Sequence, residues 1–517
     1  MKNFMRNKSS YLLKATWLVA LLAVNLSCED FLDQKPQSAL TTGNAYNNAA
    51  DVEAALNGIY NSFMQGEYYH YINVMLEDVR SDNAYAGGGG DIPMVQMDNL
   101  QITADNPKVY ELWRDLYAAI GRSNILLQKI NGVNDPALEI NDRRNQVRGE
   151  ALFLRAFHYY QLAKVFGGLP LERNSNTADP SKTKISRATE AETYDFIIAD
   201  LEEAAALLPD NYGTDPTVNK VRATKGAANA LLAKAYAQRS DRNYTKVLEY
   251  CNKVISSPAG YALVNDYATL FDGNNYGSSE SIMEIAYSDV SWDVSSWGVQ
   301  LYLVPEEGWE KYGTPSRDLV NAYNAEGDVA RKNATILFQN YAPSWQQEGA
   351  YVNWNPCADP NPAMAVPFNN KQKHPNGWKS GDNLYLLRLA DIILLKAEAQ
   401  NELNDVAGAT TTLNQIRTRA GIATVSGLTQ AQLRDKILNE RRLELAFEAQ
   451  RWDDLVRFGK ATTVMNNLNE KRYTCIAGVP DAGTPIIYEG ADYKWFLPIP
   501  TKEMSANPNL RQNPGYN

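Results

Sequence analysis

Apolar residues recur at helical spacing through the first half of the chain and again near its carboxyl end. In one run Ile197, Leu201 and Ala204 precede Pro209 at offsets of four, three and five residues. Two later runs repeat this series nearly or in part: Val247, Cys251, Val254 and Pro258, then Ala409, Leu413 and Ile416. This spacing resembles the second helix of a tetratricopeptide repeat, in which small apolar residues let helices pack closely. The pattern predicts a mainly α-helical scaffold.

The preceding apolar runs predict the partner helices of these pairs. They lie at residues 144–165, 223–238 and 384–401, with an earlier pair at 51–64 and 109–130.

A further helix is predicted from about Thr429 to Gly459, and it carries many charges among its apolar residues. Glu440, Glu444 and Glu448 recur every four residues and therefore share one helix face. We expect arginines to neutralise this row, from this helix or from a neighbour: Arg441, Arg442 and Arg451. Catalytic carboxylates usually differ in pKa at the mouth of a pocket, so matched charges favour a packing helix over an active site.

Helical periodicity fades between residues 271 and 381, where Gly, Pro, Asn and Trp become dense. A second irregular region is predicted at 77–107, and it contains the glycine run 87–90. Long loops on a rigid scaffold commonly carry function. These two regions are therefore where we expect a binding site.

The amino end has the pattern of a signal peptide. Basic residues precede an apolar run at 15–24, which ends shortly before Ser27 and Cys28. The run is shorter than the roughly 20 residues that span a bilayer. We expect cleavage before Cys28 and lipidation of that cysteine; an ordinary secretory cut is the alternative.

Composition limits the classes of function. The chain has 517 residues and a formal net charge of −10, which argues against a nucleic-acid partner. Its four cysteines do not predict a disulfide framework; Cys251 is expected in the core, and Cys357 and Cys475 could pair. His158 is expected to pack inside a helix, and no metal, phosphate-loop or nucleophile motif is present.

The irregular regions contain the side chains expected of a sugar-binding surface. Aromatic rings can stack on sugar faces, while amide, carboxylate or guanidinium groups bind the hydroxyls. The aromatic candidates are Tyr85, Trp292, Trp297, Trp309, Trp345 and Trp354, and the polar candidates are Arg80, Asp82 and Asn83. For each tryptophan the alternative is a loop anchor packed against the scaffold.

Several blocks together resemble the SusD/RagB family. They include "LRLADIILLKAEA", "LNQIRTRAGI", "ERRLELAFEAQRWDDLVRFG" and "WFLPIPTKEMSANPNLRQNPGY" towards the carboxyl end, and "GEALFLRAFHYYQLAKVFGGLPL", "TYDFIIADLEEAAALLP" and "ATKGAANALLAKAYA" before them. The resemblance implies a SusD-like fold and a lipid-anchored outer-membrane protein exposed on the cell surface. It also implies capture of oligosaccharides and their delivery to a SusC-like TonB-dependent transporter, which the protein would cap as a lid, without a cofactor or catalysis.

Other functions remain open on the sequence alone: peptide uptake as in the RagB branch, glycoside hydrolysis, and a protein-only repeat adaptor. The expected organisation is a signal peptide at 1–27 and a mature protein at 28–517. Within the mature protein, 45–270 and 382–460 form the helical scaffold, and 271–381 and 461–517 form loop-rich binding and packing segments.

Overall fold

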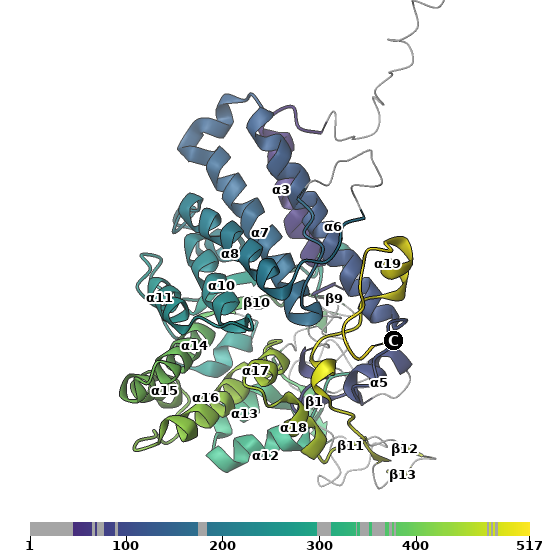
Figure 1. The fold of residues 1–517 in the computed structure, drawn as a ribbon. Helices are drawn as coiled ribbons and strands as arrows, with labels where there is room; N and C mark the ends of the chain where they lie inside the picture. The colour runs from purple at the N-terminus through teal and green to yellow at the C-terminus, as the bar shows by residue number, and fades with distance from the viewer. Residues whose placement is uncertain are drawn as a thin grey trace, which may run out of the picture.

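The structure is a computed structural model. It describes residues 45–64, 68–69, 77–87, 91–173, 184–273, 275–296, 312–337, 339–341, 351–353, 368–371, 375–376, 379–472, 475–476, 479–480 and 484–516. Helices dominate these residues, which confirms the mainly α prediction (Figure 1). No described helix is both long enough and apolar enough to cross a membrane.

Consecutive helices pack side by side and form the scaffold, which runs from α6 and α7 in the upper part of Figure 1 to α14 and α15 at its lower left. Each contacts the next along most of the series α6, α7, α8, α10, α11, α14 and α15. Their bounds are Pro107–Lys129, Arg143–Phe166, Glu190–Leu207, Lys225–Gln238, Tyr244–Ile255, Leu389–Glu402 and Val406–Arg419. The helices predicted from the repeating pattern are therefore present, and the earlier α3 (Ala49–Tyr60) packs against α6 and α7.

Local sequence explains where these helices begin. Thr189 caps α8 by accepting from the Glu192 backbone N–H, and the Glu192 side chain accepts from the Thr189 N–H in return. Thr224 and Asp405 cap α10 and α15 without this reciprocal bond, since only the capping side chain accepts from a backbone N–H. The alanines of α10 are buried almost throughout, so small side chains let it pack closely against α8 and α11.

The predicted start of the helix at residue 384 is wrong. Residues Leu384–Arg388 form strand β10, which pairs antiparallel with β2 (Ser281–Ile285). Helix α14 begins only at Leu389, whose N–H donates to the carbonyl of Glu280. The short, continuous apolar run of LYLLR fits a strand as well as a helix, and only the distant partner strand decides between them.

The single charged helix predicted from Thr429 to Gly459 is two helices, α16 (Gln430–Leu445) and α17 (Arg451–Arg457). Thr429 caps the first as part of a capping box. The break contains Phe447 and Ala449 at φ values of 62° and 55°, in the left-handed region that side chains disfavour. The buried Asp78 carboxylate accepts from both of their N–H groups at 3.2 and 3.4 Å.

The segment expected to be irregular between 271 and 381 contains two helices, α12 (Arg317–Glu326) and α13 (Val329–Thr335). The region 77–107 likewise contains α5 (Ile92–Asp98). Ser316 and Gly327 cap the two ends of α12, and Gly327 has a φ of 65°. These helices are short, and the surrounding sequence is rich in Gly and Asn. Their apolar periodicity is therefore too short to predict a helix from the sequence.

Small elements complete the described chain. A two-residue ladder joins β1 (Ala84–Tyr85) to β3 (Thr314–Pro315). The other short ladders pair β4 (Ile336–Leu337) with β7 (Phe368–Asn369), β5 (Gln339–Tyr341) with β6 (Tyr351–Asn353), β8 (Pro375–Asn376) with β9 (Lys379–Ser380), β11 (Lys471–Arg472) with β14 (Thr484–Pro485), and β12 (Cys475–Ile476) with β13 (Val479–Pro480). The remaining helices are η1 (Asn61–Met64), η3 (Ile130–Gly132), η4 (Pro136–Asp142), α9 (Pro216–Val221), η6 (Tyr267–Phe271), α18 (Ala461–Asn467), η11 (Asp492–Trp495) and α19 (Thr501–Ala506).

The acidic row is largely buried and ion-paired, as the packing interpretation predicted. The expected single helix face is wrong, because Glu448 lies beyond the end of α16 and only Glu440 and Glu444 share a face of that helix. The predicted partners are wrong, however. Glu440 binds Arg331 and Arg417, Glu444 binds Arg331, Arg388 and Arg419, and Glu448 binds Arg388 and Lys371.

The three arginines expected to neutralise this row bind other acids. Arg441 binds Asp391 and Asp454, Arg442 binds Asp82 and Asp318, and Arg451 binds Asp82. Neighbouring residues on a helix point in different directions, so Arg441 and Arg442 leave the face that carries the glutamates.

Candidate functional site

Trp292 is the predicted site residue that the structure exposes. It begins the short helix η7 (Trp292–Val294), which follows β2, and its side chain is 55% exposed. The turn is held from both sides, because the Ser288 N–H donates to the Val294 carbonyl at 2.8 Å and the Ser296 N–H donates to the Ser380 carbonyl at 2.7 Å. A fixed backbone therefore presents an indole ring to solvent.

The same turn borders a cavity of about 490 Å³, because Val294 forms part of its wall. The remaining lining comes from the end of α3 and η1, from α9 and from β2. Its members are mostly apolar: Asn57, Tyr60, Asn61, Phe63, Met64, Val218, Val221, Arg222, Met283, Glu284, Ile285 and Ala286. Its volume falls within the range of small-ligand sites.

A buried carboxylate fixes the polar side of this cavity. Glu150 accepts from the Tyr60 hydroxyl at 2.7 Å and from two nitrogens of Arg222 at 2.9 and 3.0 Å. Burial first, and then the charge of Glu150, raise the pKa of Tyr60 well above its usual value, so the phenol stays neutral. The exposed amides of Asn57 and Asn61 supply further hydrogen-bonding groups at the surface.

The other described candidates are buried, and they bind groups within the protein. Arg80 donates to the Lys494 carbonyl at 2.9 Å, and its guanidinium lies 4.4 Å from the Trp452 ring centroid. Asp82 accepts from Arg451 at 2.7 and 2.8 Å, and Asn83 accepts from Arg442 at 2.9 Å. These three side chains were expected to contact a ligand, but in the structure they bind other groups of the protein.

Tyr85 is only 2% exposed and packs in a small apolar cluster with Leu100, Trp452 and Leu455. Four further candidates lie outside the described residues: Trp297, Trp309, Trp345 and Trp354. Cys28 and Cys357 also lie outside them, so the lipidation and the pairing with Cys475 stay predictions.

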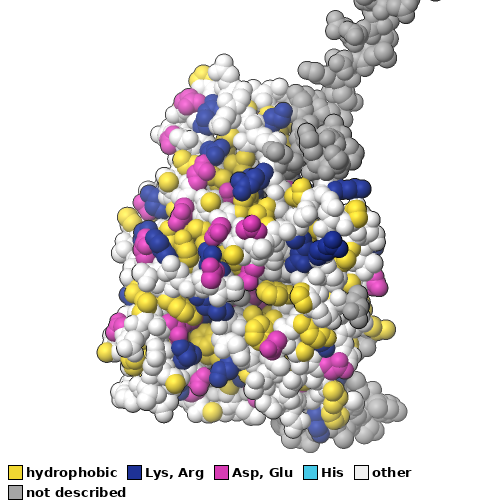
Figure 2. Space-filling view, viewed as in Figure 1, with side chains coloured by type: hydrophobic (Ala, Val, Ile, Leu, Met, Phe, Trp, Pro, Cys, Tyr) yellow, Lys and Arg dark blue, Asp and Glu magenta, His cyan; other side chains and the backbone are white. Residues whose placement is uncertain are grey.

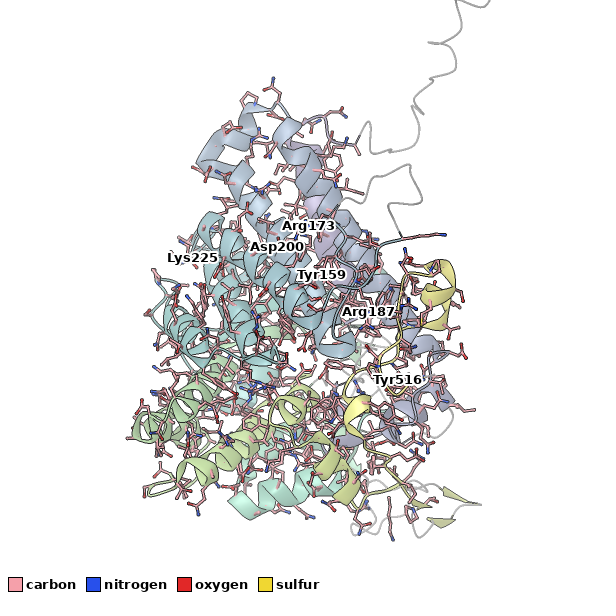
Figure 3. The ribbon with its side chains drawn as sticks, in the orientation of Figure 1. Tyr159, Arg173, Arg187, Asp200, Lys225 and Tyr516 are labelled. Carbon is pink, nitrogen blue, oxygen red and sulfur yellow. The ribbon has the colours of Figure 1, made fainter. Side chains whose placement is uncertain are left out.

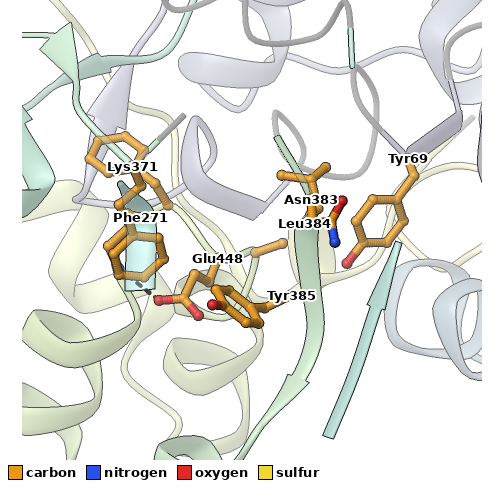
Figure 4. A pocket seen from close by; sticks show the side chains of 9 residues that line it. Tyr69, Phe271, Lys371, Asn383, Leu384, Tyr385 and Glu448 are labelled. Carbon is orange, nitrogen blue, oxygen red and sulfur yellow. Dashed lines mark hydrogen bonds and ion pairs between the residues drawn. The ribbon is translucent and has the colours of Figure 1, made fainter. Parts of the chain in front are cut away.

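A smaller cavity of about 30 Å³ lies between η6, β10 and the break after α16 (Figure 4). Lys371 and Glu448 form an ion pair at 2.7 Å beside it. Burial lowers the pKa of Lys371 to about 8, although Glu448 acts in the opposite direction. Such a volume holds water rather than a sugar ring, so we assign this cavity to the packed interior.

Glu444 of α16 and Glu448, which follows that helix, do not have the properties of a catalytic pair. Burial opposes ionisation of Glu444, but Arg419, Arg388 and Arg331 outweigh it and hold its pKa well below the usual value. The pKa of Glu448 is also lowered, because Arg388 and Lys371 together outweigh the opposing effect of burial. A general acid at neutral pH needs a raised pKa instead. These two carboxylates are therefore structural anions.

His158 and Cys251 are core residues, as predicted. Burial lowers the pKa of His158 to about 3, and its Nδ1 lies 2.8 Å from the Tyr68 hydroxyl. Cys251 is fully buried and free. Within the described ranges, no group of three or more His, Cys, Asp or Glu side chains could hold a metal ion.

The cavity beside Trp292 was missed in the sequence because its walls come from distant segments. Met64 ends the short helix η1, Val218 lies within the short helix α9, and Met283 lies in the apolar strand β2. None of these positions departs from the pattern of core residues, and only folding brings them together around an empty volume.

Comparison with known proteins supplies the family. The model of the SusD family matches residues 238–516, and a model described as "Starch-binding associating with outer membrane" matches residues 30–237. SusD-like protein P2 of Formosa agariphila is 29% identical over 97% of this chain and 99% of its own length. The starch-binding protein SusD of Bacteroides thetaiotaomicron is 25% identical over 77% of this chain and 76% of its own.

Solved structures agree with this assignment. A laminarin-binding SusD-like protein is 26% identical and superposes with a TM-score of 0.72, over 91% of this chain and 100% of its own. The fold, the repeating helices and the two family matches lead to the same conclusion: the chain belongs to the SusD family.

Proposed function

We propose that the protein is a non-catalytic, cell-surface binding protein that captures oligosaccharides and delivers them to a SusC-like TonB-dependent transporter. Membership of a family with starch- and laminarin-binding relatives supports a sugar ligand. The observation that carries the proposal is the exposed Trp292 ring on a fixed turn beside a cavity of about 490 Å³. Amphipathic rings of this kind offer a flat apolar face to a ligand and a wet edge to solvent.

The proposed anchor is a lipid on Cys28, which lies outside the described residues. A single acyl chain binds membranes weakly, whereas two or more give stable attachment. The lipid would tether the folded protein so that the Trp292 surface lies outside the membrane and the protein caps the transporter. The visible face carries interspersed positive and negative side chains (Figure 2), which does not resemble the basic stripe of a nucleic-acid site.

A glycan array tests the proposal directly, followed by calorimetry with each glycan that binds. We expect Trp292→Ala to weaken binding roughly 5- to 30-fold, the equivalent of about 1–2 kcal/mol, because a central aromatic contact is lost. The melting temperature should stay nearly unchanged, since the ring is largely exposed. Ile487→Ala removes a comparably exposed apolar side chain from another segment and serves as the control.

Other outcomes would identify another function. Equal affinity in Trp292→Ala and the wild type would move the site away from this turn. Binding to a peptide library but to no glycan would indicate the RagB-like alternative. The appearance of new reducing ends during incubation with glycans would overturn the non-catalytic assignment.

A further inference from the structure

A second cavity of about 310 Å³ lies at the other side of the amino-terminal helices, between α6, the segment that follows α7, and α19. Trp113 and Tyr117 of α6 contribute aromatic side chains to its lining. Their ring centroids are 4.9 Å apart with a tilt of 36°. None of its lining residues belongs to the cavity beside Trp292.

Hydrogen bonds to backbone atoms hold the walls of this cavity. The Tyr117 hydroxyl donates to the Pro170 carbonyl at 2.9 Å. On the opposite side, Asn507 donates to the Ile185 carbonyl at 2.9 Å and Asn509 donates to the Lys184 carbonyl at 2.6 Å. These bonds hold the backbone segments that carry the lining side chains in place.

Arg187 ties the same wall to the end of α7. It donates to the Gly168 carbonyl at 2.7 Å and to the Phe166 carbonyl at 2.8 Å, and it also donates to the Arg511 carbonyl at 2.8 Å. Figure 3 labels Arg187 between α7 and the carboxyl-terminal segment that carries α19. One guanidinium thus joins three parts of the chain around the site.

Two carboxylates line the cavity without a direct ion-pair partner among the described residues. Among the described residues, neither Glu172 nor Glu503 forms an ion pair, although the Trp113 side chain hydrogen-bonds to Glu503. Burial, followed by the charge of Glu503, raises the pKa of Glu172, and burial also raises that of Glu503. Because neither carboxyl group has an ion-pair partner among the described residues, both retain acceptor oxygens that a ligand with hydroxyl donors could satisfy.

The cations at this site argue against a metal ion or an amine as the ligand. Arg114 and Lys184 both line the cavity, and Arg114 also donates to Asp115 at 2.7 Å. They would repel a second cation, whereas guanidinium and ammonium groups donate readily to sugar oxygens. Trp113 is only 3% exposed, so the aromatic surface at the cavity comes from the partly exposed Tyr117. The combination of this ring, two acceptor carboxylates and two cationic donors fits a neutral, polyhydroxylated ring.

We propose that the cavity between α6 and α19 is a second saccharide subsite, in which Glu172 and Glu503 accept hydrogen bonds from hydroxyls of a hexopyranose ring. The inference rests on the proposed sugar-binding function but concerns a separate surface. A cavity of this size lies at the lower end of ligand sites, which suits one or two sugar units.

The test is calorimetric titration of the full mature protein with short laminari- and malto-oligosaccharides. The wild type is compared with Glu172→Ala/Glu503→Ala, with Trp292→Ala, and with Glu139→Ala as a control glutamate whose side chain is 66% exposed. We expect two sites per chain in the wild type, and only one of them at wild-type affinity in each of the first two variants. Loss of hydrogen bonds to charged acceptors should weaken the second site roughly 10- to 100-fold.

The outcomes separate this inference from the proposed function. One site that is lost in Trp292→Ala and unchanged in the double glutamate variant overturns the second subsite alone. One site that is lost only in the double variant supports the subsite and removes the role of Trp292. If neither the laminari-oligosaccharides nor the malto-oligosaccharides bind the wild type, the inference is overturned. If the double variant unfolds, Arg114→Ala replaces it in the titration. The Arg114 side chain is half exposed, so we expect its loss to leave the protein folded.

Discussion

The guanidinium of Arg388 donates from Nη1 to Oε1 of Glu444 at 2.6 Å, in the interior of the protein. Arg388 ends strand β10, and Glu444 lies in the last turn of α16. The same glutamate also binds Arg331 and Arg419. A single carboxylate therefore joins a strand, the helix α13 and the end of α15 to the charged helix.

Glu444→Ala should lower the free energy of unfolding by about 3–5 kcal/mol, because it leaves buried guanidinium groups without a partner. Chemical denaturation of the purified variant measures this change. Glu203→Ala is the control, since its pair with Arg148 is partly exposed, and such pairs contribute about 0–1 kcal/mol. Equal losses in the two variants would show that the interior network is not the stabilising element.

Asp82 should contribute stability that disappears in acid. Burial opposes its ionisation, but Arg442 and Arg451 outweigh that effect and lower its pKa to about 2. Since the folded pKa lies below the unfolded value of about 3.9, the contribution is complete above that value and is lost as the pH falls towards 2. The stability difference between the wild type and Asp82→Asn should therefore shrink below about pH 4.

Asp318→Asn provides the matched comparison for this pH dependence. Asp318 shares the partner Arg442, at 2.7 Å, but its side chain is 51% exposed. Solvent screens such a pair, so its substitution should have a smaller effect at every pH. A difference that stays constant from neutral to acid pH for Asp82→Asn would contradict the prediction.

Asp78→Ala should destabilise the break between α16 and α17 by about 1–3 kcal/mol, because the N–H groups of Phe447 and Ala449 lose their buried acceptor. Asp78→Asn keeps an acceptor oxygen and should lose less. Burial raises the pKa of Asp78 to about 7, above its unfolded value. The wild type should therefore lose stability relative to Asp78→Asn as the pH rises from about 4 to 7, which thermal unfolding across this range would detect.

Cys28→Ala should move the protein from the membrane fraction to the soluble fraction, since lipid attachment is the proposed anchor. Fractionation followed by immunoblotting measures the distribution, and Cys251→Ala controls for the loss of a cysteine elsewhere. Continued membrane association of Cys28→Ala in cells that lack the transporter would contradict the lipid anchor.

The sequence determined the fold class, the positions of most scaffold helices and the family. Helical periodicity depends on nearest neighbours along the chain, so the repeating runs predicted α8, α11 and α15 without tertiary information. It also predicted that the charges of α16 pack rather than react. That prediction required only that acidic and basic residues occur in similar numbers at helical spacing, which can be read from the sequence.

Only the tertiary structure decided which charges pair, which predicted helical residues form a strand instead, and which candidate residues face solvent. Asp82, Asn83 and Trp292 are all polar or aromatic residues of apparently irregular segments, yet the first two are buried and the third is exposed. Segments distant in sequence cover Asp82 with Arg442 and Arg451. Burial is set by such long-range contacts, which no local pattern records, and for that reason the proposed binding surfaces could be identified only in the folded chain.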